Sequence, residues 1–186
     1  ICLTIASMNK AEIAALLQVN HKQFIDLQST LDERKFTTSI NGKWSPSQEL
    51  DHIIRAVQPV VLAFYLPSFF LKFIFGTANR PSRSYEALVE KYHHKLAHGG
   101  KASGRFIPKG IRFKIRDTAL QKLESLVNRL TRKIEKKQEE WLDHTILPHP
   151  LLGKVTLREM LYFTAYHVEH HRKNTLRNLE ASLISK

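Results

Sequence analysis

The chain has 186 residues, which is enough for one domain with a sizeable core. Its 42% hydrophobic and 25% charged content, with only seven Gly and seven Pro, excludes a loop-rich or disordered chain. One cysteine, Cys2, excludes an intramolecular disulfide framework and favours a reducing compartment, so we expect a cytoplasmic protein. Residues 1–7 precede Met8 and are too few for a signal peptide. We interpret them as a non-native or disordered extension of a single domain over residues 1–186.

The formal net charge of +12 is large. Such a charge suits nucleic acid, an anionic membrane surface or a pocket mouth that attracts anionic substrates. The basic residues are not interleaved with aromatic ones, and no nucleic-acid-binding motif is recognisable, so nucleic acid is disfavoured as a partner, and we expect no membrane partner.

The predicted helices begin with a segment from Lys10 to Leu31, opened by a capping-box pattern of Asn9 and Glu12. A second helix begins after Ser45, with Pro46 at its first position. Gln48 completes a second capping box there, and Pro59 and Pro67 are expected to kink or break the helix.

Residues 60–75 are strongly apolar, but Pro67 and Lys72 interrupt them. They fall short of the ~20 residues that span a bilayer, so we predict a buried helix and no membrane segment. The alternative is an exposed association patch, such as a homodimer interface, that includes Phe69, Phe70 and Phe73.

The middle of the chain is less regular. Residues 84–98 predict a short helix that ends at two glycines, and residues 101–116 form a basic loop. We favour a solvated surface for this loop over a binding role. A third helix is predicted from Asp117 to Asp143, and a fourth from the capping box of Thr156 and Glu159 to Leu183.

Each long segment carries one apolar stripe, and no run of alternating strand pattern is convincing. The expected fold is therefore all-α, a four-helix bundle with an irregular middle region.

Histidines on the inner helix faces are the main candidates for chemistry. His167 and His171 are spaced i, i+4 beside the core stripe of the last helix, where both can bind one metal ion. His52, among apolar residues of the second helix, is the candidate third ligand, because bundles build metal sites from facing helices. Spacing alone leaves a basic helix with unliganded histidines as the alternative.

Four other histidines are interpreted differently. His94 and His98 have the same spacing, but at a helix end where they complement the terminal carbonyls and the helix dipole. His149 could be a loop ligand or a turn residue, and we favour the turn. His170 is expected to point away from the shared face and to be exposed.

Three segments, in this order, resemble the DinB-like superfamily of metal-binding four-helix bundles. They are Trp44–Ile53 with its histidine, His149–Thr156 before the last helix, and His167–Arg172. The resemblance implies a bacterial protein related to bacillithiol- and mycothiol-dependent transferases. It also implies that His52, His167 and His171 bind a divalent ion, zinc or nickel. Asn174 stands where the family often has Gln, and its shorter side chain could still hydrogen-bond near the site.

The leading hypothesis is a divalent-metal-dependent enzyme, a thiol transferase, isomerase or hydrolase, acting with a small-molecule thiol or on an anionic substrate. Gln48, Arg55 and Asn174 are the candidates for contacts around the ligands or with substrate. The alternative is a metal-binding or protein-interaction module without catalysis. Nucleic-acid binding through the basic loop is a third hypothesis.

Overall fold

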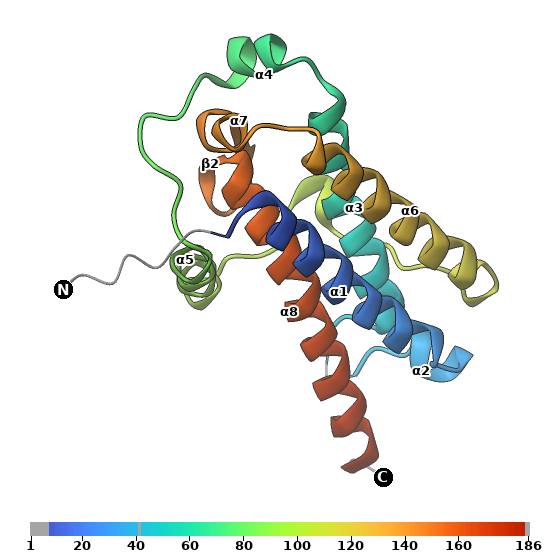
Figure 1. The fold of residues 1–186 in the computed structure, drawn as a ribbon. Coiled ribbons are helices and arrows are strands. Elements are labelled where there is room, and N and C mark those ends of the chain that lie inside the picture. The colour runs from blue at the N-terminus through green and yellow to red at the C-terminus, as the bar shows by residue number, and fades with distance from the viewer. Residues whose placement is uncertain (1–7, 41, 185–186) are drawn as a thin grey trace.

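Four long helices form the body of the protein: α1 (Lys10–Ser29), α3 (Pro46–Tyr65), α6 (Arg116–Glu135) and α8 (Leu157–Ile184). The computed structural model describes residues 8–40 and 42–184, so the predicted extension at residues 1–7 lies outside the described residues. Helices α1 and α3 each pack against both α6 and α8, and the four enclose a shared apolar core (Figure 1). The predicted all-α four-helix bundle is confirmed.

The starts of three helices follow the predicted capping boxes. The Asn9 side chain accepts hydrogen bonds from the first turn of α1, and Glu12 returns a bond to the Asn9 backbone. Ser45 and Gln48 make the same reciprocal pair at α3. At α8, Glu159 accepts from the Thr156 backbone at 3.0 Å. Each box satisfies N–H groups that a helix start leaves without partners.

The two prolines of the second predicted helix act differently. Of the predicted kink or break at Pro59, the break does not occur, because Pro59 lies inside α3. The helix buries Val57, Val60 and Val61 on either side of the proline. Packing of this apolar face offsets the lost backbone bond. Pro67 does end the helix, because the residue before a proline is driven out of the helical region, and Leu66 has ψ 147°.

The apolar stretch after Pro67 leaves the bundle. Helix α4 (Ser68–Phe75) is bent by 116° from α3 and lies at one end of the molecule (Figure 1). Only Leu71 of α4 is buried, whereas Phe69 is 74% and Phe73 88% exposed. The buried-helix prediction is therefore wrong for α4. Among the described residues, no individual helix is long and apolar enough to cross a bilayer, although α3 and α4 pass that test together as a bent pair.

The third predicted helix is divided in two. Helix α6 ends at Glu135 and a short α7 (Glu139–His144) follows. Lys10, from the start of α1, donates from Nζ to the carbonyls of Glu135 and Lys137, and its backbone donates to Glu139. These distant partners satisfy the groups exposed by the break, which local periodicity could not reveal.

The connections carry the remaining elements. They are α2 (Glu33–Thr37), α5 (Tyr85–Ala97), the 3₁₀ turns η1 (Gly104–Phe106) and η2 (Phe113–Ile115), and the strands β1 (Ile146–His149) and β2 (Gly153–Thr156). The prediction of no strands is wrong for β1 and β2, which form an antiparallel hairpin with His149 opposite Gly153. Four-residue strands with a proline inside one of them are too short to show alternation.

Candidate metal centre

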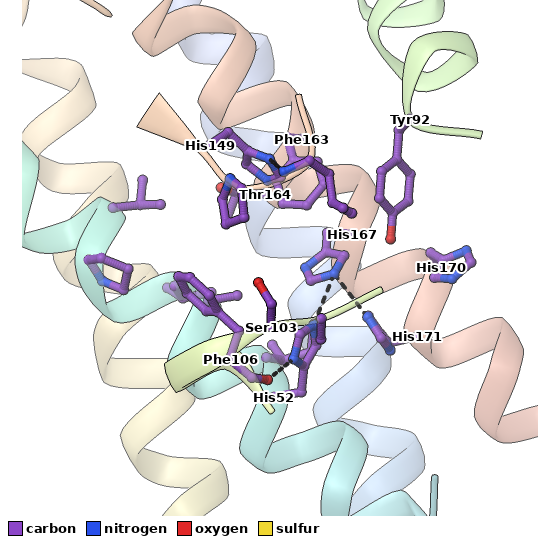
Figure 2. Close-up of a pocket in the computed structure, with 18 of the residues that line it drawn as sticks. His52, Tyr92, Ser103, Phe106, His149, Phe163, Thr164, His167, His170 and His171 are labelled. Carbon is purple, nitrogen blue, oxygen red and sulfur yellow. Dashed lines mark hydrogen bonds between the residues drawn. The ribbon is translucent and has the colours of Figure 1, made fainter. Parts of the chain in front are cut away.

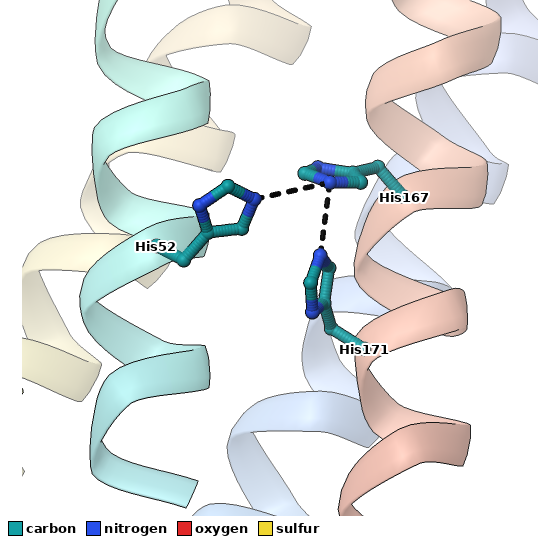
Figure 3. Close-up of side chains that lie close together, drawn as sticks. All are labelled: His52, His167 and His171. Carbon is teal, nitrogen blue, oxygen red and sulfur yellow. Dashed lines mark hydrogen bonds between the residues drawn. The ribbon is translucent and has the colours of Figure 1, made fainter. Parts of the chain in front are cut away.

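Three histidines from two helices meet inside the bundle. His167 and His171 lie one turn apart on α8, and His52 projects from the facing side of α3 (Figure 3). All three are buried, with exposures of 5 or 6%. The Nε2 atom of His167 lies 3.2 Å from His52 Nε2 and 2.9 Å from His171 Nε2. One nitrogen from each ring lies within 4.8 Å of the others, as in a metal-binding group.

The protons of these rings cannot satisfy both nitrogen–nitrogen contacts. The Nδ1 atom of His52 donates to the Phe106 carbonyl at 2.7 Å, so Nε2 of a neutral His52 carries a lone pair. If His167 Nε2 is protonated, its single proton serves one contact; if not, its lone pair faces that of His52. No neutral assignment makes both contacts hydrogen bonds. A cation among the three lone pairs removes the conflict, so the residues fit a metal ion.

The spacing of the nitrogens agrees with that fit. Tetrahedral zinc binds imidazole nitrogen at about 2.0–2.1 Å, which places two such nitrogens about 3.3 Å apart. The contacts of 3.2 and 2.9 Å around His167 are close to this separation. Three histidine ligands leave a fourth position open, as in catalytic rather than structural sites.

The outer nitrogens of two rings are held by fixed partners. His52 bonds to the Phe106 carbonyl, and His171 Nδ1 contacts the Glu49 carboxyl group. A partner on the outer nitrogen fixes the ring orientation and makes the inner nitrogen a better ligand. Aromatic rings complete the walls, because Trp44 stacks on His171 and Phe163 stacks on His167.

Burial keeps the three imidazoles neutral. It lowers the pKa of His52 to about 4 and that of His171 to about 3, and it lowers the pKa of His167 well below the usual value. Neutral imidazole is the form that binds metal. The same burial raises the pKa of Glu49 to about 8. A cation held by the histidines would favour the carboxylate form of Glu49, against the effect of burial.

The histidines line a cavity of about 1000 Å³. It runs between α3, α8, α4, β1 and the segment 100–107, and Figure 2 shows Ser103 and Phe106 of that segment beside His52. Ser103, Tyr92 and His170 also line it near the three rings (Figure 2). The basic side chains of this segment, Lys101 and Arg105, are exposed, as the solvated-surface interpretation predicts. The backbone of the same segment also reaches the site, since its Phe106 carbonyl orients a candidate ligand.

Two of the predicted accessory residues lie away from the three rings. Gln48 is occupied in the capping box of α3, and Arg55 pairs with Asp51 and donates to the Arg105 carbonyl. Neither lines the cavity. Asn174 does line it, but it bonds to His170 and Arg177 instead of a candidate ligand.

The other histidines divide as follows. His98 donates from Nδ1 to the His94 carbonyl at the end of α5, which confirms its predicted role at the helix terminus. His149 is a turn residue, because its Nδ1 accepts from the backbone of Leu151 and Leu152. His170 is half-buried and lines the cavity, so the prediction that it is exposed and points away is wrong.

Sequence reasoning missed three groups at the centre. Glu49 lies three residues before His52, a spacing that puts both on one helix face and could have identified it. Trp44, just before the α3 cap, stacks on His171. The Phe106 carbonyl carries no sequence signal, because any residue offers a carbonyl group.

The chain belongs to the DinB superfamily, which it matches over residues 16–174. No curated protein matches it. Among solved structures it is similar to YfiT from Bacillus subtilis, with a TM-score of 0.63 and 17% sequence identity over 98% of this chain and 92% of that one. YfiT is described as a probable metal-dependent hydrolase with an unusual four-helix bundle topology. At this identity, the similarity establishes the shared fold.

Proposed function

We propose that the protein is a divalent-metal-dependent enzyme, a hydrolase or a thiol transferase, with His52, His167 and His171 as its metal ligands. Zinc and nickel are the favoured ions on the family resemblance, and imidazole ligands suit both of them, as they also suit copper and iron. The observation that carries the proposal is the convergence of three buried Nε2 atoms that no neutral proton arrangement can satisfy. Membership of the DinB superfamily and the description of YfiT support the same class of chemistry.

The chain's own residues would orient the ligands and the substrate. The Phe106 carbonyl and the Glu49 carboxyl group hold two rings, and Trp44 and Phe163 stack on His171 and His167. A divalent ion held there supplies Lewis acidity that lowers the pKa of a water or thiol nucleophile. The cationic side chains that line the cavity would attract an anionic substrate: Lys43, Lys101, Arg105 and Arg177.

The test combines metal analysis with activity. We expect the purified protein to carry about one divalent ion per chain and to hydrolyse activated esters or transfer a small thiol to an electrophile. His171→Ala should lose both the ion and the activity, whereas His94→Ala should keep both. A rate that depends on added thiol would identify a transferase, and a thiol-independent rate a hydrolase. Failure to retain zinc or nickel after loading would contradict the proposal.

A second candidate is a metal-binding interaction module without turnover. It is favoured by the exposed phenylalanines of α4, Phe69, Phe70 and Phe73, which could bind a second copy of the chain. Phe73→Ser should then convert a dimer into a monomer in light scattering without changing metal content. A monomeric parent protein would exclude the dimer.

A further inference from the structure

The cavity extends well beyond the candidate metal centre. Its volume of about 1000 Å³ is at the upper end of the range of about 300–1,000 Å³ for small-molecule sites. Three histidines and one small nucleophile occupy only one end of such a space. The remainder must be explained by the shape and polarity of what it binds.

One face of α3 lines the cavity from the histidines to the end of the helix. His52, Ala56, Val60, Ala63 and Leu66 all line it, at spacings of three or four residues. At about 1.5 Å per residue, the stretch from His52 to Leu66 is roughly 21 Å long. The alanines leave room along this wall, so the cavity is elongated and follows the helix.

The other walls of the far section are mainly apolar. The polar side chains that β1 and the first two turns of α8 add to the cavity lining, His149 and Thr164, are hydrogen-bonded to backbone groups of Leu151, Leu152 and Met160. The lining residues from α4 are Leu71 and Phe75, and β1 and α8 add Leu147 and Met160. Leu71, Leu147 and Met160 are largely buried in the described structure. A polar ligand would lose its hydration here without gaining hydrogen bonds from these side chains, which excludes it from this section.

The histidine end has the opposite character. Lys43 precedes Trp44, whose ring stacks on His171, and the Glu49 carboxyl group at this end is engaged with His171. The other charged residues that line the cavity are all exposed cations: Lys101, Arg105 and Arg177. This end therefore favours an anionic group. A ligand that matches both ends has an anionic head and a long apolar tail.

We propose that the cavity binds a single-chain amphiphile of the fatty-acyl type, with its anionic head near the histidines and its alkyl chain along α3 toward α4. The assignment of the head as the reacting end rests on the proposed metal-dependent function. The assignment of the far section to an alkyl chain rests on its apolar walls alone. The substrate class would then be compounds with a long acyl chain rather than small polar ones.

Titration calorimetry on the full chain tests this proposal. The ligands are straight-chain alkanoates from butanoate to tetradecanoate, kept below their micelle concentrations. We expect the dissociation constant to fall by about fourfold per methylene, which corresponds to roughly 0.8 kcal/mol. The gain should stop when the chain fills the channel. An affinity independent of chain length would overturn the proposal.

Two variants test which part of the cavity limits the length of the bound alkyl chain. Ala63→Phe should block the far section, so that long alkanoates lose their advantage while butanoate binds as before, which also shows that the variant is folded. Phe75→Ala should shift the limit to longer chains. If neither variant moves the limit, the alkyl chain does not lie along α3 and the proposal fails.

A control separates the cavity from the outer surface of α4. Phe73 is 88% exposed and does not line the cavity, so Phe73→Ala should leave the chain-length dependence unchanged. Loss of the dependence in this variant would assign binding to the exposed patch and overturn the proposal. Metal content is measured on the same samples. If the protein binds alkanoates but holds no metal, only the proposed enzymatic function is contradicted. If it holds metal but binds no alkanoate, only the proposal of an alkyl-chain channel is contradicted.

Discussion

Two histidine pairs with identical spacing have opposite surroundings in this protein. His167 and His171 are buried on α8 and direct their Nε2 atoms toward each other and toward His52. His94 and His98 are exposed at the end of α5, where their rings stack 4.1 Å apart and His98 bonds to a helix carbonyl. The i, i+4 spacing is therefore no metal signal by itself. A third nitrogen from a facing helix and the loss of water distinguish the two pairs.

The largest expected effect is on the affinity for zinc. His52→Ala removes the ligand on the facing helix α3. It should weaken zinc binding by more than the 10- to 100-fold that is typical when a residue hydrogen-bonded to a ligand is replaced. His94→Ala should leave the affinity unchanged. Competition against a chromophoric chelator measures both values. Equal affinities in the two variants would break the distinction between the pairs.

The next largest effect concerns the Glu49 carboxyl group, which contacts His171 of the α8 histidine pair. Glu49→Gln keeps the size of the side chain but removes the carboxylate beside His171, and zinc affinity should fall by roughly 10- to 100-fold. Gln48→Ala is the neighbouring control. It should cost about 1 kcal/mol of stability through the lost capping box, with zinc affinity preserved. A wild-type affinity in Glu49→Gln would assign that carboxyl group a purely structural role.

His21 tests what burial does to a histidine outside the centre. It is buried in α1, and burial lowers its pKa to about 4. Below pH 6.5 the unfolded chain binds a proton that the folded chain does not, so stability falls with falling pH until about pH 4.

The corresponding measurement is urea unfolding at pH 7 and pH 5. Between these values His21 should remove about 2 kcal/mol of stability from the parent protein, and His21→Leu should lack this share of the loss. The change in unfolding free energy between pH 7 and pH 5 is compared between the two proteins, and this comparison cancels the pH-independent effect of the substitution. An identical pH dependence in both proteins would mean that His21 is protonated as readily when folded as when unfolded.

The smallest effect belongs to the exposed pair. His98→Ala removes one side-chain bond to the end of α5 and should lower the free energy of unfolding by at most about 1 kcal/mol. Thermal unfolding measures the change. A loss of several kcal/mol would show that the exposed pair has a structural role beyond the helix terminus.

The bundle and the positions of the three rings could be predicted from local signals. Capping boxes at Asn9, Ser45 and Thr156, together with apolar stripes, indicate helix starts and inner faces. The failures depend on partners distant in sequence. Lys10 stabilises the break after α6, and the Phe106 carbonyl reaches His52 across 54 positions. The exposure of α4 follows from the turn at Pro67, after which its apolar residues have no bundle face to cover.

Anomalous diffraction from crystals of the zinc-loaded protein tests the three-histidine site most directly. We expect one strong peak per chain, within about 2.0–2.1 Å of Nε2 in His52, His167 and His171. A peak at His94 and His98, or no peak at the three buried rings, would contradict the three-histidine site.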